Sequence, residues 1–145
     1  MELTRRDLGI MCAGVVAAAT LAGKAGLAFA IEDNGTAEAI RAFTGGAEVR
    51  EGGVTLGAPE IAENGSTVPI NVKADGAAAI LILAPGNPNA GVVTFEFSAL
   101  SGERAAATRI RLAKTQDVVA VARMEDGSFA MAKRHIKVTI GGCGG

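Results

Sequence analysis

A cysteine near the C-terminus has the chemistry of a nucleophile in an unusual setting. Cys143 stands in the segment Gly141-Gly142-Cys143-Gly144-Gly145, which ends the 145-residue chain. The thiolate form of cysteine is the nucleophile, and glycine leaves the backbone around it unrestricted. The sequence therefore predicts a flexible arm over residues 141–145, which reaches at most about 17 Å when extended.

The setting of Cys143 favours a covalently carried group over the other roles of a cysteine. A buried core position is implausible beside four glycines at a chain end, and prenylation needs three residues after the cysteine, where only two follow. An intermolecular disulfide stays open as an alternative. Nothing on the arm would activate the thiol, so a receiving enzyme would have to do so. We expect Cys143 to be the attachment point of a substrate, with freedom of movement given by Gly141, Gly142, Gly144 and Gly145.

The first thirty residues predict an export signal. Arg5-Arg6 is followed by an apolar stretch over residues 8–22 and by Ala28-Phe29-Ala30, a small-residue pattern that suits signal peptidase. The twin arginine indicates the Tat route, with cleavage after Ala30. The alternative is a membrane anchor, which needs about 20 apolar residues, and this stretch is shorter.

Removal of residues 1–30 leaves a domain predicted over residues 31–140 and makes Cys143 the only cysteine, because Cys12 lies in the signal. The mature chain has 11 basic and 13 acidic side chains, a net charge of −2. This balance and the lack of Trp and Tyr argue against nucleic-acid binding. We expect a periplasmic protein with no membrane attachment after signal removal, and a lone cysteine there needs a functional reason because thiols usually pair in such compartments.

Other candidate sites in the sequence are weak. His135 is the only histidine, its polar neighbours indicate a solvent-facing side chain, and a metal site would need more ligands, so we expect neither metal nor cofactor. Glu32-Asp33 and Glu125-Asp126 fit a helix cap and a turn, and Ser98 and Ser101 have no visible base. The charges predicted to form a solvated sheet face, able to help hold an anionic adduct or an acidic partner, are Arg109, Arg111, Lys114 and Arg123.

A short helix is predicted over residues 33–43. Asp33 or Asn34 can cap its first turn, and Gly45-Gly46 ends it. The apolar residues predicted to share its buried face are Ala37, Ile40 and Phe43.

Alternating apolar residues from Ala47 onward predict strands with one buried face. The run Ile80-Leu81-Ile82-Leu83 predicts a strand buried on both sides, and the clearest hairpin turns at Asp126-Gly127, with the last strand ending at Ile140. About seven strands at this spacing predict an all-β, immunoglobulin-like β-sandwich with a short N-terminal helix and a flexible C-terminal arm. The alternating apolar residues are Val68, Ile70, Val72, Val93, Phe95, Phe97, Ile110, Leu112, Val119, Val121, Ile136, Val138 and Ile140.

Several stretches resemble the SoxY family, the sulfur-carrier subunits of the periplasmic thiosulfate-oxidising (Sox) system. The glycine-flanked Cys143 is the specific element of the resemblance, which covers nearly all of residues 31–145. The other stretches are Gly53-Val54-Thr55-Leu56, Pro59 to Gly65, Thr108 to Gln116, Val118 to Ala122 and Asp126-Gly127-Ser128-Phe129.

The resemblance implies a carrier subunit that is not an enzyme and that holds thiosulfate-derived sulfur covalently on Cys143. It implies a heterodimer with a SoxZ-like small β-sandwich subunit. It also implies visits to a periplasmic haem enzyme that joins thiosulfate to the thiol, a hydrolase that releases sulfate, and a molybdenum-haem sulfane dehydrogenase or an alternative route.

Two other functions remain to be weighed against the carrier. An exported binding or assembly module could use Cys143 for a disulfide with a partner. A thiol oxidoreductase usually needs a Cys-x-x-Cys pair, which this chain lacks.

Overall fold

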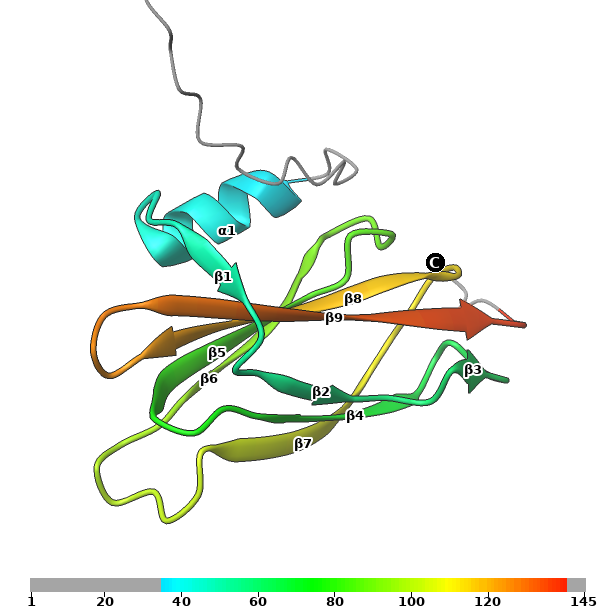
Figure 1. Ribbon diagram of the computed structural model, residues 1–145. Helices are drawn as coiled ribbons and strands as arrows, with labels where there is room; N and C mark the ends of the chain where they lie inside the picture. Colours follow the sequence, from blue (N-terminus) through cyan, green and yellow to red (C-terminus); the bar gives the residue numbers. More distant parts are fainter. Residues whose placement is uncertain (1–34, 141–145) are drawn as a thin grey trace, which may run out of the picture.

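Figure 1 shows a computed structural model of the protein, in which residues 35–140 are described. Two sheets pack face to face, as the sequence predicted for a β-sandwich. The larger sheet has the strand order β1-β9-β8-β5-β6, with β3 also paired to β9, and the smaller has the order β2-β4-β7. The elements are α1 (Thr36–Thr44), β1 (Val49–Glu51), β2 (Thr55–Gly57), β3 (Ile61–Ala62), β4 (Val68–Lys73), β5 (Ala77–Leu83), β6 (Gly91–Glu96), β7 (Ala105–Ile110), β8 (Gln116–Met124) and β9 (Phe129–Val138).

The core between the sheets follows the predicted alternation most closely in β4. Val68, Ile70 and Val72 are buried there, and the residues between them are exposed. They meet Ile80 and Ile82 of β5 in one apolar cluster. Burying one such aliphatic side chain contributes about 1.5–3 kcal/mol to folding, so this cluster holds the two sheets together.

The central strands β5 and β8 are buried on both faces. The prediction for Ile80-Leu81-Ile82-Leu83 is confirmed, since all four side chains are buried. The predicted alternation around Val119 and Val121 is wrong, because Ala120 between them and Ala122 after them are fully buried as well. Small alanines fill the inter-sheet core on one face, and α1 covers the other face, where the second apolar cluster lies.

Helix α1 lies across the outer face of the larger sheet (Figure 1). It ends at Gly45, whose φ of 64° is the left-handed conformation that glycine adopts without strain, as the sequence predicted. Ile40 and Phe43 pack on the sheet as expected, but Ala37 is exposed and Ala39 takes its place. The helix begins at Thr36 rather than at residue 33, and Gly35 is its N-cap without a side-chain capping bond, so the prediction that Asp33 or Asn34 caps it is wrong.

Strand β9 is the element that leads to the C-terminus. The predicted hairpin is present: β8 and β9 pair antiparallel, and Gly127 has a φ of 83° in the turn between them. The strand ends at Val138 rather than at Ile140, whose side chain is largely exposed. Phe97 and Leu112 also lie just beyond strand ends, although both pack against the core.

Two short strands that the sequence did not predict pair parallel with β9. β1 is aligned with its first half, where Val49 is opposite Phe129, and β3 with its last residues, where Ala62 is opposite Val138. Together with β8 they flank β9 on both sides. The C-terminal strand is therefore an interior strand of the sheet.

The turn of the β8–β9 hairpin gives a pH-dependent prediction. Asp126 Oδ1 accepts hydrogen bonds from the hydroxyl and the backbone N–H of Ser128, at 2.6 and 2.8 Å, and these lower the pKa of Asp126. A carboxylate with a depressed folded pKa stabilises the fold above its unfolded pKa and loses that contribution as pH falls through the folded value. Asp126→Ala should lower the unfolding midpoint in urea at neutral pH, and the difference from wild type should shrink below pH 3.8.

Ser128→Ala is the matched control for this turn, because it removes the hydroxyl bond and keeps the backbone bond. It should give a smaller loss with the same dependence on pH. An Asp126→Ala deficit that persists undiminished in acid would contradict the role of the ionised carboxylate.

Candidate functional site

The arm and its cysteine, residues 141–145, lie outside the described residues, and the structure describes the base from which they continue. Ile140 is the last described residue, and its carbonyl accepts a hydrogen bond from Gly65 N–H at 2.8 Å. Cys143 follows three residues later, a span of about 10 Å at full extension. The thiol is thus confined to the neighbourhood of this end of the sandwich, called here the arm end.

The segment around β3 holds the last residues of the chain along one side. Lys137 N–H donates to the Glu60 carbonyl at 2.9 Å, and Thr139 N–H donates to the Ala62 carbonyl at 3.0 Å. The Thr139 hydroxyl also donates to the Glu63 carbonyl at 3.1 Å. These bonds carry the pairing with β9 past the formal end of the strand.

Thr115 holds the same end from the other side. Its hydroxyl accepts from Val138 N–H at 2.9 Å, and it donates to the Val138 carbonyl at 3.3 Å. A side chain here replaces the backbone partner that β8 supplies only from Gln116 onward. The base of the arm is consequently fixed on both sides.

A partly buried amide network joins the neighbouring loops at the arm end. Gln116 Oε1 accepts from Gly86 N–H at 2.7 Å, and its Nε2 donates to Asn87 Oδ1 at 3.0 Å. Asn87 in turn donates to the Arg111 carbonyl at 2.7 Å and accepts from Ala113 N–H at 2.9 Å. A Cβ on Gly86 would lie 2.9 Å from the Gln116 side chain, so only glycine fits there. A glutamine and an asparagine far apart in the sequence gave no signal of this contact.

The four charges predicted to share one sheet face do not do so. Arg109 lies on the outer side of the smaller sheet, while Arg111 and Lys114 lie in the loop after β7. Arg123 lies in the larger sheet, over the ring of Phe43 at 5.8 Å. Strand connections, which the sequence alone could not place, separate these residues.

His135 is exposed, as predicted, and its Nδ1 lies 2.7 Å from Asp117 Oδ1 on the paired strand. The outer face of β9 also carries Lys133 and Lys137, on either side of His135. Sequence reasoning treated this strand only as the support of the arm. The alternation of polar and apolar residues in β9 was visible in the sequence. Which face of the strand is exposed to solvent depends on where α1 and β3 pack, and the sequence alone did not show this.

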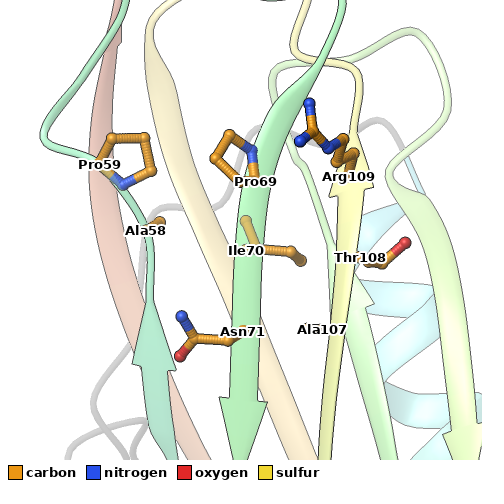
Figure 2. A pocket seen from close by; sticks show the side chains of 8 residues that line it. All are labelled: Ala58, Pro59, Pro69, Ile70, Asn71, Ala107, Thr108 and Arg109. Atoms are coloured by element: carbon orange, nitrogen blue, oxygen red, sulfur yellow. The ribbon is translucent and has the colours of Figure 1, made fainter.

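An open hollow lies on the outer side of the smaller sheet (Figure 2). Its volume is about 580 Å³, and Arg109 is the one charged residue among those that line it. The other lining residues are Ala58, Pro59, Pro69, Ile70, Asn71, Ala107 and Thr108. This lining has no nucleophile paired with a base, so it does not form a catalytic site.

Residues 35–140 contain no feature of a metal site or of a membrane-spanning helix. No group of three or more His, Cys, Asp or Glu residues in this range could hold a metal ion. No helix in the same range is long and apolar enough to cross a membrane.

Ser98 and Ser101 are engaged with each other, since Ser98 N–H donates to the Ser101 hydroxyl at 3.1 Å.

Comparison with known proteins identifies the family. Residues 40–143 match the family described as sulfur oxidation protein SoxY, a match that extends to Cys143. The chain belongs to the SoxY family. The solved structure of the sulfur carrier protein SoxY from Chlorobium limicola f thiosulfatophilum is 36% identical, with a TM-score of 0.64 over 72% of this chain and 96% of that one. The SoxY resemblance seen in the sequence is thereby confirmed.

Other solved structures share the fold alone. The superoxide reductase (neelaredoxin) from Ignicoccus hospitalis is 16% identical with a TM-score of 0.53, over 60% of this SoxY chain and 80% of that chain. The hypothetical protein PH1083 from Pyrococcus horikoshii is 14% identical with a TM-score of 0.51, over 61% and 96%. No curated protein sequence matches this chain.

The amide network predicts that substitution of Gln116 lowers the free energy of unfolding, while substitution of a nearby exposed residue does not. Gln116→Ala leaves the N–H of Gly86 without its acceptor in a part-buried site, which costs about 1–3 kcal/mol. Urea unfolding followed by circular dichroism measures the loss. Asn89→Ala, an exposed residue in the loop between β5 and β6, is the control and should change stability by less than about 0.5 kcal/mol. Equal losses in the two variants would contradict the network.

Proposed function

We propose that this SoxY-family chain is a periplasmic carrier, not an enzyme, that holds thiosulfate-derived sulfur covalently on Cys143 and presents it to sulfur-oxidising enzymes. One observation carries the proposal: the family match runs to residue 143 and so includes the glycine-flanked cysteine. After the predicted cleavage following Ala30, this is the only thiol of the protein.

The loading step is an oxidation. The Cys143 thiol loses its proton, its sulfur bonds to the terminal sulfur of thiosulfate, and two electrons leave for the haem enzyme that catalyses the step. The product is a cysteine-bound thiosulfonate with a single negative charge. The protein contributes the sulfur atom and its position, and the electron acceptor belongs to the visited enzyme.

The unloading steps follow from the bonds in that adduct. Water attacks the terminal sulfonate sulfur, the bond between the two outer sulfur atoms breaks, and sulfate leaves, so that Cys143 keeps one sulfane sulfur as a persulfide. The hydrolase catalyses this cleavage. A sulfane dehydrogenase then oxidises the outer sulfur with oxygen atoms from three water molecules and takes up six electrons, which leaves a cysteine-bound sulfonate. Hydrolysis of the remaining sulfur–sulfur bond releases a second sulfate and restores the Cys143 thiol, and an alternative route would remove the sulfane sulfur by another acceptor.

The arrangement at the arm end supports a presenting role. Gly65, Thr115 and the β3 segment fix the chain up to Ile140, and the cysteine follows within about 10 Å. A rigid body with a short arm limits the conformations that the thiol explores, which lowers the entropy lost when the arm enters a pocket.

We further propose the export route and the partner that the SoxY family implies. The twin-arginine signal over residues 1–30 would deliver the protein to the periplasm by the Tat pathway. A SoxZ-like small β-sandwich subunit would complete the carrier as a heterodimer. Size-exclusion chromatography with multi-angle light scattering on protein purified from its own periplasm tests the heterodimer directly.

Cys143→Ser should abolish adduct formation while leaving the fold intact. Protein is purified from cells oxidising thiosulfate, and intact-mass analysis then locates any thiosulfonate or persulfide on the C-terminal peptide. Wild type should carry these adducts, and the serine variant should carry none and should not support thiosulfate oxidation. An unmodified C-terminal peptide in wild type, under conditions where oxidation proceeds, would overturn the carrier role.

The assembly alternative makes a different prediction for the same variant. If Cys143 serves a structural disulfide, non-reducing gels of wild type should show a stoichiometric cross-link to a partner. Cys143→Ser would then abolish assembly and leave sulfur turnover unaffected.

A further inference from the structure

We propose that the arm end carries a basic docking surface, formed by Lys133, His135 and Lys137 of β9, for acidic protein surfaces around the active-site entrances that the Cys143 arm enters. The inference rests on the proposed carrier function. It adds a recognition element on the folded domain, distinct from the arm.

The three side chains form a row on one face of one strand. Alternate residues of a strand point to the same side, about 7 Å apart, so Lys133 and Lys137 are separated by about 14 Å with His135 between them. Register places His135 opposite Asp117 and Lys137 opposite Ile61. His135 and Lys137 are exposed, and Lys133 is half-buried beside fully covered Val119.

The length of the arm brings this row against any enzyme that takes up the thiol. Cys143 is six residues from Lys137, at most about 20 Å of extended chain, and three residues from the fixed Ile140. When the thiol binds deep in an enzyme pocket, this short chain length requires the arm end of the sandwich to lie next to the entrance of that pocket. Ile61, whose side chain is 57% exposed beside Lys137, adds apolar surface to the same contact.

Charge is unevenly distributed along the sandwich, although the whole chain is nearly neutral at −1. Basic residues outnumber acidic ones toward the arm end. The end of β7 and the loop after it contribute Arg109, Arg111 and Lys114, and β9 contributes Lys133 and Arg134 at its middle and Lys137 near its end. The acidic residues of that end are Glu60, Glu63 and Asp117.

The opposite end shows the reverse balance. Lys73 pairs there with Glu103 at 2.8 Å and Arg104 with Glu125 at 2.5 Å. At the arm end Arg134 likewise pairs with Glu60 at 3.6 Å and His135 with Asp117 at 2.7 Å, so the two ends differ in the number of charges of each sign and not in whether the charges are paired. Further acids at the opposite end are Asp75, Glu96 and Asp126, and the cations Arg50 and Arg123 lie there as well. Acidic residues therefore slightly outnumber basic ones at that end. The sandwich is thus polarised, with its positive side at the arm.

The extent of the row favours a protein surface over a small anion. A single bound sulfonate would need cations converging on one point, whereas these side chains are spread over about 14 Å of a strand. Complementary charges spread across an interface act mainly on the rate of encounter and fix orientation. Such a surface speeds docking without binding the enzyme so tightly that release becomes slow.

The test compares two doubly substituted carriers with the same net charge. Lys133→Glu with Lys137→Glu reverses the row, and Arg41→Glu with Lys73→Glu makes the same change in net charge at exposed positions elsewhere. Each full-length mature protein, together with its partner subunit, is loaded by the haem enzyme with thiosulfate. Intact mass gives the initial rate of adduct formation at limiting carrier concentration.

The row variant should load about tenfold more slowly at low ionic strength, with the deficit shrinking at high salt because screening weakens surface charge interactions. The control pair should stay within about twofold of wild type. Lys133→Gln with Lys137→Gln should give an intermediate rate. Alkylation of Cys143 by neutral iodoacetamide should proceed equally in all of them, which shows that the thiol is equally accessible.

Equal loading rates for the row variant and the control would overturn the docking surface. Absence of loading in wild type would refute the carrier function itself, and the docking surface with it. A row variant slowed with a small dianionic disulfide reagent, but not with iodoacetamide, would assign the row to small anions. Salt-sensitive binding of wild type to phosphatidylglycerol vesicles, with loading unaffected by the substitutions, would assign it to a membrane surface.

Discussion

The double burial of β5 and β8 is the constraint on which the rest of the structure depends. Their inner faces pack against the smaller sheet, and their outer faces pack under α1. Neither strand can therefore move to an edge without exposing one of its two apolar faces, for example the face of Leu81 and Leu83. β9 must then pair on the free side of β8, and this places the C-terminal end of the chain at the sandwich end that holds the fixed arm base.

The residues that fix the C-terminal end of the domain are different from the residue proposed to react. Hydrogen bonds from Gly65, Thr115 and the β3 segment fix the chain through Ile140, while the reactive sulfur lies just beyond them in sequence. None of the described groups at the arm base forms a nucleophile–base pair. A carrier benefits from this division, because an unactivated thiol does not react until a receiving enzyme supplies the activation.

The fold could be predicted where apolar and polar residues alternate strictly. Doubly buried strands, very short strands and contacts between distant loops could not be predicted from such patterns. β4 alternates strictly because one of its faces meets solvent, so Val68, Ile70 and Val72 were readable. β8 was misjudged because both faces are buried, which hides the period of two. β1 and β3 have only three and two residues, too few for any period. Contacts such as Gln116 with Gly86 depend on tertiary folding, whereas Cys143 could be proposed as a site from its own neighbours in the sequence.

The interior position of β9 has a mechanical consequence. In the proposed carrier cycle, tension on the C-terminal residues would act along the axis of β9, and the hydrogen bonds to β8, β1 and β3 cross that axis. Tension is then shared by many bonds loaded in shear, whereas a terminal strand at a sheet edge can be peeled away one bond at a time. The pairing on both sides of β9 therefore resists extraction of the C-terminal strand from the sandwich.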